Sequence, residues 1–109
     1  MFNVNTWRKC RVVEMKFKNG LTLSMDWSSG SYSSNKSRLF QEPQNSVETC
    51  ELIVYNENGA LDASCYNMQS YTAKDDPSLC KYVSADDVAK VIALVANMKE
   101  ENMKFAEDK

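Results

Sequence analysis

Histidine is absent from this 109-residue chain. Its absence removes the commonest general base, the Ser-His and Cys-His nucleophile pairs, and most transition-metal sites. An enzyme with this composition would have to rely on carboxylates, lysine or tyrosine alone. The sequence therefore predicts a protein without catalytic activity, and a histidine-free enzyme is kept only as a third alternative.

Metal-binding patterns are scarce as well. Four cysteines are present: Cys10, Cys50, Cys65 and Cys80. They contain no C-x-x-C pair, which is the usual half of a zinc site. The acidic pairs Asp75-Asp76 and Asp86-Asp87 lack the spacing of a calcium loop. We therefore expect no metal and no cofactor, with the cysteines as free thiols in a reducing compartment.

Long apolar runs are also missing. No stretch approaches the roughly 20 residues that a membrane-spanning helix needs, and the N-terminal segment lacks the apolar region of a secretory signal. The formal net charge of −2 gives no global basic field for nucleic acid. We expect a single domain over residues 1–109, located in the cytoplasm, without a membrane and without direct nucleic-acid binding.

Alternating apolar and polar residues on both sides of Asn19-Gly20 predict a first β-hairpin. Its strands cover about residues 10–17 and 21–27. A three-residue loop over 18–20 places apolar residues opposite one another on one face of the hairpin. Gly20 then occupies the loop position that needs a positive φ.

A second hairpin is predicted around the turn at residues 56–59. A four-residue loop pairs Val54 with Leu61 and Cys50 with Cys65, which keeps apolar side chains on one face. The facing thiols leave open whether they form a bridge. A further short edge strand is expected near residues 70–73.

The clearest local signal is the start of a C-terminal helix. Ser84 is an N-cap, and Asp87 occupies the third helical position of a capping box. The stripe at helical spacing is Val88, Val91, Ile92, Val95 and Met98. The helix is predicted over about residues 85–106, with the tail after residue 102 either frayed or in contact with another protomer. The predicted fold is α+β, with an antiparallel sheet of two β-hairpins (about residues 10–73) packed against this long helix.

A hydroxyl-rich loop, residues 28–46, separates the two hairpins. Loops at strand ends carry function more often than the scaffold does. Its serines and two cations could hold an anion, and its aromatic residue could stack on a base. The alternative is a flexible polar loop without a ligand.

An apolar and an aromatic residue of the second hairpin complete the candidate site. Ile53 and Tyr55 lie on the strand face that should be polar if it were exposed, which indicates a second contact with the 28–46 loop or with another subunit. The candidate binding residues are Trp27, Ser31, Tyr32, Ser33, Asn35, Lys36, Arg38, Ile53 and Tyr55.

Three segments, residues 17–35, 48–59 and 83–88, resemble a loose set of short bacteriophage proteins. The shared features are an Asn-Gly hairpin, a following loop with an aromatic residue, Gly, Tyr, Ser and Asn, a second hairpin that ends in Gly, and a Ser-x-Asp-Asp-Val helix start. The resemblance implies a phage origin, and with it a role in host takeover or counter-defence. It transfers no site residue.

Two functions follow as hypotheses. The first is a non-enzymatic inhibitor, of the anti-CRISPR or a related anti-immune kind, that binds and blocks a host defence protein through the sheet face or the 28–46 loop. The second is a homo-oligomeric sponge that sequesters a nucleotide immune signal through that loop. The expected partner is therefore a host protein or a small nucleotide, and the oligomeric state is open.

Overall fold

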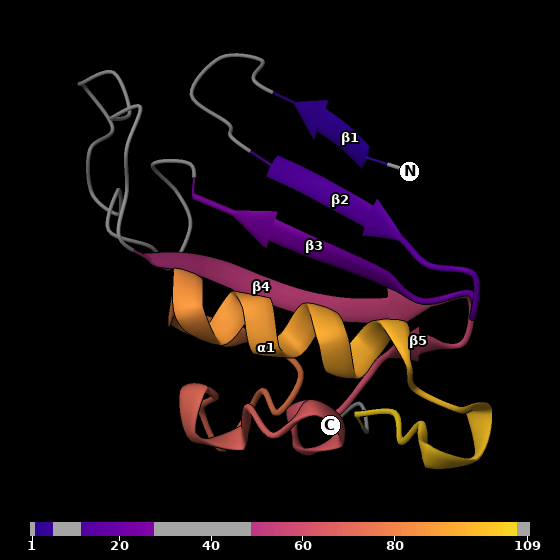
Figure 1. Cartoon of the computed structure of the whole chain (residues 1–109). Helices are drawn as coiled ribbons and strands as arrows, with labels where there is room; N and C mark the ends of the chain where they lie inside the picture. Colours follow the sequence, from indigo (N-terminus) through magenta and orange to yellow (C-terminus); the bar gives the residue numbers. More distant parts are fainter. Residues whose placement is uncertain (1, 6–11, 28–48, 107–109) are drawn as a thin grey trace.

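The computed structural model describes residues 2–5, 12–27 and 49–106 (Figure 1). The fold is α+β, as predicted: one antiparallel sheet with a helix on one face. Its elements are β1 (Phe2–Asn5), β2 (Val12–Lys16), β3 (Thr22–Asp26), β4 (Thr49–Asn56), β5 (Gly59–Ala60), η1 (Ala63–Tyr66), η2 (Gln69–Tyr71), β6 (Cys80–Ser84), α1 (Ala85–Ala96) and η3 (Glu100–Asn102), where η marks a 3-10 helix. The strand order is β1-β2-β3-β4, and β5 and β6 both pair with the far edge of β4.

The first hairpin forms as predicted. Phe17 N donates to Leu21 O at 2.9 Å, Gly20 N donates to Phe17 O at 3.1 Å, and Gly20 has a φ of +90°. These bonds define a three-residue loop with glycine at the position where a Cβ would be strained. A further strand that was not predicted, β1, pairs with β2 on the outer side of this hairpin. β1 has only four residues, which is too short to show a clear alternation in the sequence.

The second hairpin is shorter than predicted. Its register at the turn is confirmed, since Leu61 N donates to Val54 O at 2.8 Å. The returning strand ends at Ala60, and the chain then forms η1. Asp62 causes this change because its carboxylate caps η1, accepting from Ser64 N at 2.9 Å.

The strand beside the remainder of β4 is β6, so the predicted pairing of Cys50 with Cys65 is wrong. Val83 lies opposite Cys50 instead, and both Cys50 and Cys65 are free thiols. The edge strand predicted near residues 70–73 is also wrong, because η2 and a turn occupy that segment. The predicted sheet boundary near residue 73 therefore moves to the end of β6 at Ser84.

A β-bulge lets β6 bury two residues that are three positions apart. Cys80 and Val83 are 0% and 1% exposed, although side chains with odd spacing lie on opposite faces of a regular strand. Leu52 pairs with Cys80 and Cys50 pairs with Val83, so β6 holds one extra residue between them. Tyr82 takes up the irregularity with a φ of +56°.

The helix begins where predicted and ends much earlier. Ser84 caps it by accepting from Asp87 N at 3.3 Å. α1 ends at Ala96 rather than near residue 106 because the following segment turns back to pair with the chain after β5. Asp62 N donates to Lys104 O at 2.8 Å, and Ala106 N donates to Ala60 O at 2.9 Å.

The predicted fraying of the tail is therefore wrong up to residue 106, and its predicted contact with another protomer stays a prediction. Met103 and Phe105 pack against the protein's own core. The core lies between α1 and one face of the sheet, and α1 runs along β4 while β1 and β2 extend beyond it (Figure 1). Val91 and Val95 of the predicted helix stripe are 0% exposed, like Leu52 of β4. Within the described ranges, no helix is long and apolar enough to cross a bilayer.

Candidate functional site

The structure separates the sequence-predicted site residues that it describes. Trp27 follows Leu23 and Met25 on the face that α1 covers, and it packs against the core. Ile53 and Tyr55 lie on the opposite face of the sheet, where alternation along β4 places them. The remaining candidates lie outside the described residues: Ser31, Tyr32, Ser33, Asn35, Lys36 and Arg38.

The sheet face that carries Ile53 and Tyr55 is called the open face below. It is formed by Glu14 of β2, by Thr22 and Ser24 of β3, and by Ile53 and Tyr55 of β4. Glu14, Ser24 and Ile53 are neighbours in register across the three strands. α1 and η1 bury their apolar side chains against the other face, which leaves Ile53 and Tyr55 half-buried.

A hydrogen bond across the open face holds Tyr55 in place. Its hydroxyl donates to Glu14 Oε2 at 2.6 Å, so the side chain reaches from β4 to β2. The strand in between is β3, where Ser24 lies opposite Ile53. The small side chain of Ser24 leaves room for the tyrosine ring to extend across β3. The bond to Glu14, with some desolvation, raises the pKa of Tyr55.

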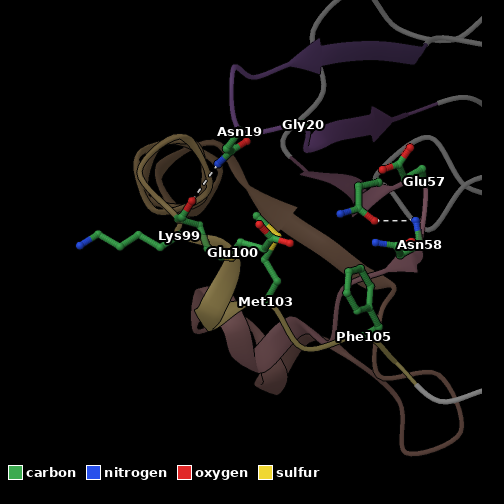
Figure 2. A pocket seen from close by; sticks show the side chains of 10 residues that line it. Asn19, Gly20, Glu57, Asn58, Lys99, Glu100, Met103 and Phe105 are labelled. Atoms are coloured by element: carbon green, nitrogen blue, oxygen red, sulfur yellow. Dashed lines mark hydrogen bonds between the residues drawn. The ribbon is translucent and has the colours of Figure 1, made fainter.

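A second feature, which the sequence analysis missed, is a hollow beside the two hairpin turns (Figure 2). We call it the turn pocket; its volume is about 790 Å³. The lining residues used below are Asn19, Asn56, Glu57, Glu100, Met103 and Phe105. They come from the β2–β3 turn, the β4–β5 turn and the segment after α1, so no local pattern in the sequence indicates them.

Hydrogen bonds hold both turns that frame the pocket. Asn19 Nδ2 donates to Val95 O at 2.8 Å and to Met98 O at 3.1 Å, which ties the first turn to the end of α1. In the second turn, Asn58 N donates to Asn56 Oδ1 at 2.8 Å. The pocket is therefore preformed rather than assembled by a ligand.

Two of the three described cysteines are buried. Burial is the largest cause that raises the pKa of Cys50 to about 12 and that of Cys80 to about 11, which keeps both as unreactive thiols. Among the residues that the structure describes, no three His, Cys, Asp or Glu side chains gather as a metal site requires. Cys65 is half-exposed, and it is the most accessible of the three described cysteines.

Comparison with known proteins gives no match: no protein-family model fits the chain, and no curated protein or solved structure is significantly similar to it.

Proposed function

We propose that this chain is a non-enzymatic binding protein that docks on a partner protein through its open face. The observation that carries the proposal is the 2.6 Å hydrogen bond from Tyr55 to Glu14, beside the half-buried Ile53. Protein interfaces are centred on aromatic and aliphatic side chains with a polar rim. A tyrosine that is fixed before binding loses less conformational entropy when the partner arrives.

The phage resemblance supplies the class of partner. A phage protein that acts by binding would inhibit a host defence protein by covering a surface that this protein needs. The complete absence of histidine supports inhibition by covering a surface of the partner rather than by a catalysed reaction. The proposed location is the cytoplasm of the host cell.

The experiment is affinity purification from a bacterial host that carries defence systems, with quantitative mass spectrometry. The baits are the wild-type protein, Ile53→Glu, Tyr55→Ala and a matched control, Leu94→Glu. Leu94 is a 40% exposed residue of α1, on the other side of the sheet, so the control adds the same charge elsewhere. Circular dichroism establishes that each bait is folded.

The proposal requires a host protein that wild type and Leu94→Glu retain and that both open-face variants lose. With that protein purified, the open-face variants should bind at least about tenfold more weakly, as expected for central interface residues. Equal capture by all four baits would show that the open face is not the docking surface.

The alternative, an oligomeric nucleotide sponge, depends on residues 31–38, which lie outside the described residues. It stays a prediction, and native mass spectrometry of gently purified protein tests it. A homo-oligomer with extra mass of nucleotide size would favour the sponge. Protein without bound mass would contradict sequestration of a host metabolite.

A further inference from the structure

The turn pocket has the size of a small-molecule site and firm walls. Its volume of about 790 Å³ falls within the roughly 300–1,000 Å³ typical of ligand sites. Asn19 anchors one wall to the end of α1, and backbone pairing of Leu61 with Phe105 anchors the other. Because the walls are fixed in advance, a ligand does not have to order them.

Two carboxylates reach this pocket from different elements. Glu57 belongs to the β4–β5 turn, and Glu100 belongs to η3. Within the described residues, neither carboxylate has an ion-pair or hydrogen-bond partner. Lys99 also borders the pocket, but Figure 2 shows its side chain extending away from the other lining side chains.

The rest of the lining is apolar. Met98 is 9% exposed, and Met103 and Phe105 are half-buried residues that pack against the core. Thioether and aromatic groups accommodate an alkyl chain, and an aromatic face attracts an ammonium group. A bare metal ion would leave this surface unused, and an anion would be repelled by the carboxylates.

We propose that the turn pocket binds a linear aliphatic polyamine. Ammonium groups of the ligand pair with Glu57 and Glu100, and its alkyl chain lies over Met103 and Phe105. Asn56 and Asn58 supply amide groups at the rim of the same pocket. This site is distinct from the open face and does not depend on the function proposed for that face.

The experiment is a titration of the full-length protein with spermidine, followed by calorimetry and by backbone amide NMR. We expect saturable binding, with shifts centred on residues 19–20, 56–59 and 98–105. The neutral diol 1,4-butanediol should not bind, because it keeps the four-carbon segment of spermidine and lacks the charges. Absence of saturable spermidine binding, or equal binding of the diol, would overturn the proposal.

Charge-matched variants locate the site. Glu57→Gln and Glu100→Gln should each weaken spermidine binding by about fivefold, the effect of losing one exposed ion pair. Glu101→Gln removes the same charge from the neighbouring residue of η3, which does not line the pocket, and should leave binding unchanged. An equal loss in all three variants would show unspecific attraction to negative charge and would overturn the assignment. All three side chains are exposed, so folding is not at risk.

Discussion

The side-chain amide of Asn19 donates a hydrogen bond of 2.8 Å to the backbone carbonyl of Val95, 76 positions later in the chain. The same amide donates to Met98 O at 3.1 Å, and its Oδ1 accepts from Leu21 N at 3.1 Å. The last carbonyls of an α-helix have no partner inside the helix. The first hairpin therefore supplies the C-terminal cap of α1, and one residue joins the turn, the helix end and the turn pocket.

Replacing Asn19 by alanine should lower the free energy of unfolding by about 1–3 kcal/mol, because part-buried carbonyl and N–H groups lose their partner. Urea denaturation followed by circular dichroism measures this. Asn58→Ala is the matched control, since within the described chain the Asn58 side chain makes no hydrogen bond. The control should change stability by less than about 0.5 kcal/mol. Equal losses in both variants would contradict the role given to Asn19.

The bulge in β6 gives a second prediction. Deleting Tyr82 should leave the protein folded, because removing the extra residue places Cys80 and Val83 two positions apart, where both lie on the buried face of a regular strand and keep their partners on β4. Thermal unfolding of the deletion variant should show a cooperative transition with a melting temperature close to that of wild type. Tyr82→Gly keeps the length of the strand and accepts the positive φ, so it should stay within about 1 kcal/mol of wild type. A deletion variant that fails to fold, while Tyr82→Gly folds like wild type, would refute this account.

Features encoded within a few residues could be predicted from the sequence. Asn19-Gly20 fixes the first loop, and Ser84 with Asp87 fixes the helix start, because turn and cap hydrogen bonds act locally. The end of α1 could not be predicted in this way. The apolar stripe ends at Met98, but the following residues are compatible with a helix, and pairing with residues 60–62 draws the segment up to residue 106 away from it. β6 was hidden for a related reason, since its bulge breaks the alternation that identifies a strand.

The candidate site also has a part that the sequence could predict and a part that it could not. Alternation along β4 correctly placed Ile53 and Tyr55 together on one face. The same alternation along β3 assigns Trp27 to the other face, so grouping it with them ignored a signal that was present. The turn pocket gave no signal, because its walls meet only after α1 ends early and the tail folds back.

Tyr71 ties η2 to the first turn of α1. Its hydroxyl donates to the Asp87 carboxylate; this bond is the main cause that lowers the pKa of Asp87, and it raises the pKa of Tyr71. A lowered acid pKa gives stability that is present above the unfolded value of about 3.9 and lost as pH falls through the folded value. A raised tyrosine pKa gives stability that is present below about 10 and lost as pH rises through the folded value.

A double-mutant cycle with Tyr71→Phe and Asp87→Ala should therefore show favourable coupling from about pH 4 to pH 10. The coupling should shrink on the acid side as Asp87 protonates and on the alkaline side as Tyr71 ionises. Melting temperatures of the four proteins from about pH 3 to about pH 11 provide the measurement. The cycle also removes the contribution of the Asp87–Lys90 ion pair, because Asp87→Ala breaks that pair in both backgrounds. Coupling that is the same at pH 3 and pH 7 would rule out a charge-assisted bond.

The described cysteines should differ sharply in reactivity. Cys65 is a half-exposed residue of η1, and Lys104 N in the segment after α1 donates to its sulfur at 3.2 Å. Cys50 and Cys80 are buried beneath α1, and their pKa values are raised to about 12 and about 11. The thiolate is the nucleophile, so at pH 8 these two sulfurs are both unionised and shielded.

Iodoacetamide at pH 8, followed by peptide mass spectrometry, should modify Cys65 in the native protein. Cys50 and Cys80 should react only after urea unfolds the chain. Cys65→Ser provides the control, because it removes the fast reaction without exposing the buried pair. Labelling of Cys50 and Cys80 at the rate of Cys65 in the folded protein would mean that β6 separates from β4 under native conditions, since these two sulfurs lie on the paired strands. The bulge at Tyr82 would then mark a point of opening rather than a fixed part of the core.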